Sequence, residues 1–364
     1  MSSIYGKNIK ISIFGQSHSN AIGVSIDGLP SGFKIDLNEL NIFMRRRRPG
    51  QNRYTSGRQE PDVPEFLSGL VDGVTCGAVL AAVIHNTDAR PSDYNQLSDI
   101  PRPSHADYPA YIKYGKARDV RGGGAFSGRL TAPLCIAGGV CLQLLQREGI
   151  QIAAHVLQIG NISDQSFDSI HVNEKDFSVL REAVFPVLDV ERGEQMCAAI
   201  ENIKQKGDSL GGIVECATVN VPAGIGEPMF EGMDNRLASI LFGIPAVKGI
   251  EFGNGFSSAG LLGSENNDEY IMLENTVRTH TNNHGGILGG ITTGMPILFR
   301  VAFKPTSSIS TEQRSISLSR REEVSLSVTG RHDPCIVPRA VACVEAAAAV
   351  AVYDALLDSR RQVV

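Results

Sequence analysis

The sequence feature that most constrains this chain is a polar, glycine-rich stretch at residues 102–130, RPSHADYPAYIKYGKARDVRGGGAFSGRL. It begins with His105 in a proline-flanked turn and ends with three consecutive glycines between Arg121 and Arg129. Successive glycines let backbone N–H groups approach a ligand more closely than any Cβ would allow, and the arginines supply charge opposite to an anion. The pattern predicts a ligand-binding loop, and a flexible glycine hinge is the alternative that this stretch alone leaves open.

A cluster of arginines precedes this loop. Residues 45–58 contain six arginines and no acid, although the chain has 39 Asp and Glu against 34 Lys and Arg, a formal net charge of -5. Adjacent arginines repel one another unless an anion lies among them, and a helix C-terminus explains only part of the cluster. Arginine favours bidentate recognition of carboxylate or phosphate. The acidic balance, with Tyr54 as the one nearby aromatic, disfavours nucleic acid, so we expect a small polyanionic ligand.

No internal boundary divides the chain. Because no Pro/Ser-rich linker or charge block interrupts it, we expect a single domain over residues 1–364, and a second glycine-rich segment at 282–290 suggests internal duplication. The seven cysteines include no C-x-x-C pair, which favours reduced, mostly buried thiols in a cytoplasmic protein. The N-terminus lacks the apolar core of a signal peptide. Glu345 and Asp354 interrupt the Ala-rich residues 340–357, which predicts a buried helix rather than a membrane span.

Strand and helix patterns fill the chain between its polar loops. Strands are expected at residues 9–13, 24–29, 66–86 (a pair turning at Gly73), 150–159, 213–221 and after residue 245. Helices are expected at residues 36–48, from 127 or 131 to 147, and at 191–206, 233–241 and 340–357. Asp36 and Glu39 have capping-box spacing at the start of the first helix.

Several loops carry side chains suited to proton transfer or anion binding. His18 follows the first strand and Asp333 lies in a turn before the last helix, although ordinary turn residues are the alternative for both. The lysine and hydroxyl groups of residues 304–308 predict a phosphate-binding loop, for which a plain surface loop is the alternative. His280 and His284 are four residues apart, but the surrounding Asn and Gly indicate a loop, so no metal site is predicted.

Ten short motifs, in order along nearly the whole chain, resemble those of the chorismate synthase family. They are S-H near the start, R-R-R-P-G followed by R-Y, N-T-D-x-R-x-x-D-Y, R-P-x-H-A-D-Y, R-G-G-G, G-D-S-x-G-G, A-V-K-G-x-E, N-N-x-G-G-I-L-G-G, K-P-T-S-S and G-R-H-D-P-C. No single motif carries the resemblance, whereas their common order is highly specific.

The resemblance implies a fold and a reaction. The fold is α+β, a single domain with helical layers sandwiched between antiparallel β-sheets (a β-α-α-β sandwich), assembled as a homotetramer. The reaction is the 1,4-elimination of phosphate from 5-enolpyruvylshikimate 3-phosphate to give chorismate, the last common step of the shikimate pathway of aromatic amino acid biosynthesis. It requires reduced FMN without net redox change, and NADPH or an external flavin reductase would supply the electrons.

The resemblance also implies roles for individual side chains. His18 would protonate the leaving phosphate, His105 would protonate the reduced flavin, and Asp333 would accept a proton from flavin N5. Arg48, Arg53 and Arg331 would hold the substrate anions. The residues implied for cofactor binding are Arg47, Arg53, Ala125, Phe126, Ser127, Pro245, Ala246, Gly289, Lys304, Pro305, Thr306, Ser307, Ser308 and Arg331.

Two motifs depart from the family pattern. The usual G-E-S-H-G has Gln16 and Ser19 in place of Glu and the second Gly, and Ala125 stands where Arg or His commonly follows R-G-G-G. The alternative functions are an NAD(P)-dependent oxidoreductase and a non-enzymatic polyanion-binding protein. Against an oxidoreductase, no G-x-G-x-x-G motif follows a predicted strand. A non-enzymatic binding protein would not explain why His18, His105 and Asp333 lie beside predicted ligand loops.

Overall fold

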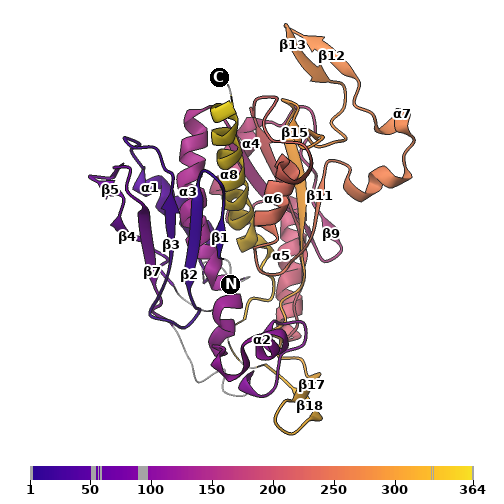
Figure 1. Cartoon of the computed structure of the whole chain (residues 1–364). Coiled ribbons are helices and arrows are strands. Elements are labelled where there is room, and N and C mark those ends of the chain that lie inside the picture. Colours follow the sequence, from indigo (N-terminus) through magenta and orange to yellow (C-terminus); the bar gives the residue numbers. More distant parts are fainter. Residues whose placement is uncertain are drawn as a thin grey trace.

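The computed structural model describes residues 3–50, 55, 57, 60–88, 97–328, 330 and 332–362. Two five-stranded sheets form opposite sides of the molecule (Figure 1), and every strand pair among the described residues is antiparallel. The first sheet has the order β1 (Ile4–Tyr5), β2 (Lys10–Gly15), β3 (Ala21–Asp27), β7 (Leu80–His85), β4 (Glu65–Ser68). The second has the order β11 (Val247–Phe252), β16 (Ile297–Phe303), β10 (Gly212–Val219), β8 (Gln151–Ile159), β9 (Ile162–Ser163).

Alternation of side chains decides which face of each sheet is buried. In β3, Ile22, Val24 and Ile26 are at most 1% exposed and belong to the main core. In β8 both faces are buried, because Ala153 packs in a second cluster with Phe177 of α4. Alternating residues point to opposite faces of a strand, so the second sheet is covered on both sides.

The helices connect and separate the two sheets. Their bounds are α1 (Leu37–Arg47), α2 (Asp107–Tyr114), α3 (Thr131–Arg147), α4 (Glu174–Glu182), α5 (Val190–Gln205), α6 (Met233–Leu241), α7 (Gly263–Asn266) and α8 (Val337–Gln362). In Figure 1, α3 and α8 stand side by side between the sheets, and α3 contacts β3 and β7 while α8 contacts β8 and β10. The protein is therefore a single mixed α and β domain with several sheets.

The contact between α3 and α8 is unusually close. Cys135 Sγ lies 4.0 Å from Cys343 Sγ, and a Cβ added to Gly138 would lie 2.2 Å from Ala346 Cα. Both pairs differ by the same number of residues, so the two helices run parallel. A Cβ on Gly139 would likewise lie 2.4 Å from Leu40 Cδ1 of α1. The small residues therefore set how near the helices approach.

Two helical segments, residues 128–147 and 337–360, are long and apolar enough to cross a membrane by length and composition, but 83% and 94% of their apolar windows are buried in the fold. The predicted buried helix at 340–357 is thus confirmed within α8. Glu345 pairs with Arg46, and Asp354 accepts hydrogen bonds from the backbone of Lys7, Asn8 and Ile9. Pairing lets both carboxylates remain inside.

Short hairpins extend from this core. They are β5–β6 (Leu70–Val71, Val74–Thr75), β12–β13 (Tyr270–Leu273, Thr276–Thr279), β14–β15 (Ile287–Leu288, Ile291–Thr292) and β17–β18 (Gln313–Ser317, Glu322–Leu326). The β12–β13 hairpin projects away from the body (Figure 1). The expected helices and main strands are present with end shifts of a few residues, whereas α2, α4, α7 and the central strand β16 were not predicted.

Candidate active site

A cavity of about 710 Å³ is lined by the first turns of α3 and α8 and by loops within residues 102–106, 122–129, 242–248, 303–308 and 332–333. Its volume is in the range of pockets that bind drug-sized ligands, about 300 to 1,000 Å³. Because α3 and α8 are parallel and both begin here, their positive ends face the same space. The cavity therefore favours anions before any side chain is considered.

The three consecutive glycines bring the two candidate histidines together. Gly122, Gly123 and Gly124 have φ of 61°, 96° and 54°. A Cβ on Gly122 would lie 2.3 Å from the His18 ring, and one on Gly123 would lie 3.3 Å from His105 Nε2. Glycine is thus required where each ring meets the loop. Direct contact of these glycines with phosphate stays a prediction.

His18 is held in a tight turn after β2. The residue is 8% exposed, its ring Nδ1 lies 3.1 Å from Ser17 Oγ, and Ser17 N donates to the main-chain oxygen of Gly124 at 3.2 Å. Ser19 Oγ accepts from Gln16 N at 3.0 Å. The serine that departs from the family motif therefore closes the turn, while Gln16 contributes its backbone.

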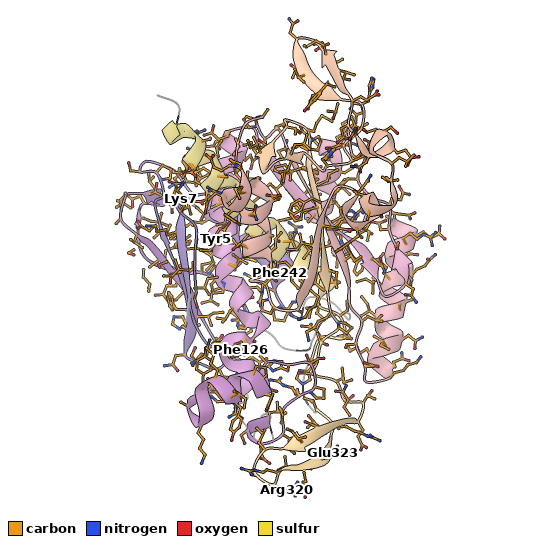
Figure 2. All side chains as sticks on the ribbon, turned by 45° about the vertical axis from the view of Figure 1, so that its right-hand side comes forward. Tyr5, Lys7, Phe126, Phe242, Arg320 and Glu323 are labelled. Atoms are coloured by element: carbon orange, nitrogen blue, oxygen red, sulfur yellow. The ribbon has the colours of Figure 1, made fainter. Side chains whose placement is uncertain are left out.

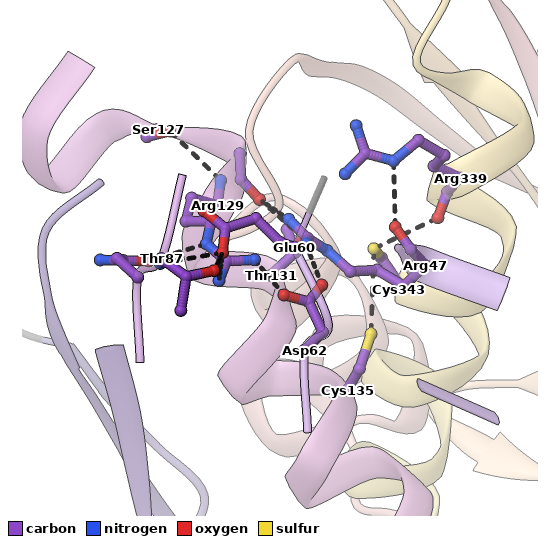
Figure 3. Close-up of polar contacts among 12 residues, drawn as sticks. Arg47, Glu60, Asp62, Thr87, Ser127, Arg129, Thr131, Cys135, Arg339 and Cys343 are labelled. Carbon is purple, nitrogen blue, oxygen red and sulfur yellow. Dashed lines mark hydrogen bonds and ion pairs between the residues drawn. The ribbon is translucent and has the colours of Figure 1, made fainter. Parts of the chain in front are cut away.

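Two cavity-lining arginines are joined behind the cavity by one buried carboxylate (Figure 3). Arg47 Nη1 donates to Asp62 Oδ2 at 2.8 Å, and Arg129 Nη1 donates to Asp62 Oδ1. Burial alone would raise the pKa of Asp62, but Arg47 and Arg129 lower it below its usual range. Arg47 also donates to Thr131 Oγ1 at 3.0 Å and to the main-chain oxygen of Gly128 at 2.8 Å. Most of its donors are therefore directed to the protein itself.

Arg129 differs from Arg47 in one respect. Its Nη2 is buried and, among the described residues, has no hydrogen-bond partner, although Glu60 Oε2 lies 3.6 Å away. Burial lowers the pKa of the Arg129 guanidinium, and Asp62 opposes this effect. A buried N–H that lacks an acceptor costs free energy until a ligand supplies one. Here the anion beside Nη2 is Glu60, and Nη2 itself is enclosed, so Arg129 brings positive charge to the cavity wall rather than a donor that a ligand can reach.

The run of arginines at the end of α1 is not one anion site. Arg46 forms two hydrogen bonds with Glu345, at 2.5 and 2.9 Å, and Arg47 faces Asp62. Arg48, the C-cap, is half-buried, and burial lowers its pKa. Part of the positive charge that the sequence assigned to an external anion is therefore neutralised inside the protein.

Two lysines, Lys248 and Lys304, also line the cavity. Lys304 Nζ donates to the main-chain oxygen of Ser104 at 2.7 Å and to Ser307 Oγ at 2.9 Å. Burial first, and then the charge of Lys248, lower the pKa of Lys304. An anion between the two lysines would relieve their repulsion. The predicted phosphate-binding loop thus has the donors and charge that a phosphate requires.

The comparisons with known proteins agree with one another. The family model described as chorismate synthase matches residues 9–357. The chorismate synthase of Lancefieldella parvula is 47% identical over 367 residues, covering 98% of this chain and 96% of the relative. That of Thermococcus kodakarensis is 45% identical over 355 residues, 98% of each. The chain belongs to the chorismate synthase family.

A crystal structure of a chorismate synthase has the same fold. It superposes with a TM-score of 0.76 at 30% identity and covers 97% of this chain and 93% of that chain. Membership of the chorismate synthase family makes the chain a lyase of aromatic amino acid biosynthesis. The oxidoreductase and the non-enzymatic binding protein are not supported.

Most residues implied by the chorismate synthase motifs lie at the cavity. Those that line it are His105, Asp333, Arg47, Ala125, Phe126, Ser127, Pro245, Ala246, Lys304, Pro305, Thr306, Ser307 and Ser308. His18 and Arg48 are not in the lining, although His18 packs on Gly122 and its neighbour Ser17 faces the cavity. Arg53 and Arg331 lie outside the described residues. The individual roles stay predictions.

Gly289 is separated from this group. It occupies the β14–β15 turn, and Figure 1 shows β15 at the opposite end of the molecule from α2. Phe126 and Phe242, by contrast, lie in the region between the two sheets (Figure 2), where both line the cavity and are partly exposed. Ala125, which departs from the motif, faces the cavity beside Phe126 without a basic side chain.

Several residues at the chorismate synthase cavity were missed from the sequence. Arg102 and Asp107 surround His105, Asp62 joins the arginines, and Arg339 pairs with Asp333. Asp107 follows His105 by two residues, so local spacing could have revealed it. Asp62 and Arg339 carry no such signal, because their partners are brought near by the fold.

Proposed function

We propose that this protein catalyses the 1,4-elimination of phosphate from 5-enolpyruvylshikimate 3-phosphate to give chorismate, with reduced FMN as cofactor. The observation that carries the proposal is the meeting of His18 and His105 on two successive glycines beside a cavity that Asp333 also lines. Candidate proton-transfer groups thereby lie at the same cavity as arginines and lysines. The substrate has two carboxylates and a phosphate, which matches the positive charge of the cavity.

The residues fit a flavin mononucleotide. Lys304, Lys248 and the hydroxyls of Ser307 and Ser308 offer the charge and donors that a phosphate group needs. The half-exposed ring of Phe126 offers an apolar surface for a flat ring system. When bound, reduced FMN would supply an electron and an acceptor for the hydrogen that the substrate loses, with no net redox change.

The side chains of this protein would then bind the substrate and transfer protons. Arg48, Arg53 and Arg331 would hold the substrate anions, and Arg129 would add positive charge to the cavity wall. His18 would place a proton on the phosphate oxygen as the C–O bond breaks, so that the group leaves as a weaker base. The Asp333 carboxylate would accept a proton at the cofactor ring, and His105 Nε2 would hold one there. Arg47 would set the anion-binding wall through Asp62.

A phosphate-release assay tests the proposal. The purified protein is mixed anaerobically with substrate and photoreduced FMN, and released phosphate and chorismate are measured together with the flavin spectrum. We expect equal amounts of the two products, no turnover with oxidised FMN alone, and a flavin spectrum that substrate perturbs. Full activity with oxidised FMN and no reductant, or NADPH consumed in proportion to product, would contradict it.

We propose a homotetramer as the assembly. Support comes from the projecting arm at residues 253–284, where Phe256 is 85% exposed and Leu262, Tyr270 and Met272 are 67–69% exposed. Apolar side chains gathered on an exposed arm favour a protein partner. Sedimentation velocity tests this, and replacing Phe256 and Met272 by serine should lower the mass if the arm joins subunits.

Three finer proposals accompany the function. The layers around α3 and α8 would be the β-α-α-β sandwich of the family, with the two sheets as duplicated halves. The protein would act in the cytoplasm. NADPH or an external flavin reductase would supply reduced FMN, and anaerobic mixing of the purified protein with FMN and NADPH distinguishes the two, since only self-reduction bleaches the flavin.

A further inference from the structure

The His105 ring is held by a carboxylate that the family motifs assign no role. Asp107, the first residue of α2, is 8% exposed. Its Oδ1 lies 2.6 Å from His105 Nδ1, and its Oδ2 accepts from Arg102 Nε at 2.7 Å and from Arg102 N at 3.0 Å. Three residues within one turn thus form a closed cluster at the edge of the cavity.

Asp107 is ionised in this cluster. Burial favours the neutral acid, but the hydrogen bonds from Arg102 and His105 outweigh it, so the pKa of Asp107 is lowered from its usual value. An ionised carboxylate only accepts hydrogen bonds. The hydrogen in the short contact with His105 must therefore be on Nδ1 of the ring.

A second contact of the same nitrogen does not change this assignment. Arg102 Nη2 lies 3.1 Å from His105 Nδ1, but it also donates to Asp107 Oδ1 at 2.8 Å. His105 Nδ1 therefore bonds to Asp107 Oδ1, its nearer and charged neighbour, because charge-assisted hydrogen bonds are shorter and stronger. Arg102 donates to Asp107, and Nδ1–H of His105 donates to the same carboxylate.

The remaining ring nitrogen is the one at the glycine loop. His105 Nε2 would lie 3.3 Å from a Cβ on Gly123, and His105 lines the cavity. Arg102 Nη1 donates to Ser308 Oγ at 3.0 Å, which fixes the cluster to the loop at residues 304–308. The ring is thus oriented from one side by Asp107, and its reactive nitrogen is directed away from it.

We infer that Asp107 is a positioning residue, which accepts the hydrogen bond from Nδ1–H of His105 and so keeps Nε2, at the cavity, as the nitrogen that gains and gives up the transferred proton. The tautomer rests on the geometry and charge of this cluster, and its catalytic use rests on the proposed function. A carboxylate that orients a histidine in this way contributes strongly in other enzymes, where its loss lowers activity by about 10- to 10⁴-fold.

The first test is spectroscopic and needs no substrate. Nitrogen NMR of the protein with ¹⁵N-labelled histidine, recorded at alkaline pH, reports which ring nitrogen carries hydrogen, and a His105→Gln spectrum assigns the signal. We expect Nδ1–H in the unmodified protein and a loss of this preference in Asp107→Asn. A ring protonated on Nε2 in the unmodified protein overturns the inference, whether or not any variant folds.

The second test is a double-mutant cycle in turnover. Asp107→Asn should lower kcat by about 10-fold or more in the otherwise unmodified protein, with little change in substrate KM, and should have no further effect in His105→Gln. Equal losses in both backgrounds would mean a merely structural role and overturn the inference. Asp99→Asn is the matched control, since its carboxylate serves Ser317 and Ser319. An inactive parent protein would instead refute the proposed function and leave the NMR result standing.

Discussion

Arg339 Nη1 lies 2.5 Å from Asp333 Oδ2, so the carboxylate proposed to accept a proton is ion-paired with a residue of the last helix. The same guanidinium donates through Nε to the main-chain oxygen of Arg47 at 3.0 Å. Asp333 also accepts from Thr306 Oγ1 through its main chain, at 3.0 Å. The turn before α8 is thereby attached both to the arginine cluster and to the loop at residues 304–308.

Replacing Asp333 by asparagine keeps the size of the side chain and removes its basicity. We expect kcat to fall by about 10²-fold or more, as for other general bases, with substrate and reduced FMN still bound. Stopped-flow flavin absorbance beside phosphate release measures both effects. Asp168→Asn, in an exposed turn, is the control. Undiminished phosphate release from Asp333→Asn would exclude Asp333 as the base.

His18→Ala and His105→Ala should each slow turnover by about 10²-fold or more, because each removes a proton donor. We expect the glycine loop to keep its conformation without the rings, and folding and FMN binding to be largely retained. Circular dichroism and flavin titration check this, and exposed His171→Ala serves as control. A variant that keeps full turnover with bound reduced FMN would show that its histidine has no part in the chemistry.

Arg48→Ala and Arg53→Ala should weaken substrate binding by roughly ten- to a hundredfold, since a lost charge-assisted hydrogen bond costs about 1.5 to 3 kcal/mol. Calorimetric titration with substrate measures the effect against Arg320→Ala, whose side chain is exposed on the β17–β18 hairpin (Figure 2). We expect no specific binding of DNA at physiological salt. Tight DNA binding together with unchanged substrate affinity would reject a small polyanion as the ligand.

Asp62→Asn should destabilise the protein by about 3 to 5 kcal/mol, because it removes the charge that compensates two buried arginines. Urea unfolding followed by circular dichroism gives the free energy. Glu322→Ala breaks an ion pair with Arg320 whose side chains are 53% and 61% exposed, and it should cost under about 1 kcal/mol. Similar losses in the two variants would mean that the buried network contributes no more than a surface pair.

A second buried cluster predicts how stability depends on pH. His155 has no exposure, with Nδ1 3.0 Å from Asp164 Oδ2 and Nε2 3.1 Å from Glu215 Oε2. Burial lowers the pKa of His155, but the two hydrogen bonds raise it above 6.5 overall. The stabilisation of the fold by these contacts is complete at pH values below the pKa of His155 in the unfolded chain. It is lost as pH rises through the pKa of His155 in the folded protein.

The free energy of unfolding should therefore exceed that of His155→Gln most near pH 6 and least near pH 9. On the acid side the advantage should persist until Asp164 and Glu215, whose pKa values are lowered, become protonated. Urea titrations across this range measure the difference. A gap between the two proteins that is constant from pH 6 to 9 would mean that the buried imidazole is not charged.

The sequence predicted which segments line the candidate active site better than it predicted the contacts among their side chains. The motifs containing His105, Asp333 and residues 304–308 were recognisable because each is short and local. The partner of Arg47, in contrast, is Asp62, whose backbone has φ of 46° in a loop without periodicity. Charge counting over the arginine run could not show that two of its members face buried carboxylates.

Secondary structure follows the same division. Long periodic segments such as α3 and α8 were predicted nearly to their ends, whereas α2 is short and contains Pro109, a residue that normally argues against a helix. Pro109 is tolerated because it lies in the first turn of α2, where a backbone N–H would have no acceptor within the helix. The close approach of Gly138 to Ala346 depends on the tertiary fold, and glycine within a helix pattern does not reveal which neighbour it meets.

The central position of α8 has a consequence for synthesis of the chain. The helix contacts strands of the second sheet and packs on α3, which covers the first, yet it follows 336 residues in the sequence. A nascent chain that has not reached Val337 would expose apolar faces of α3 and of the second sheet, and such surfaces invite aggregation during folding. We expect completion of the core to be a late event on the ribosome, so that translation arrest before α8 would yield a chaperone-bound, protease-sensitive product.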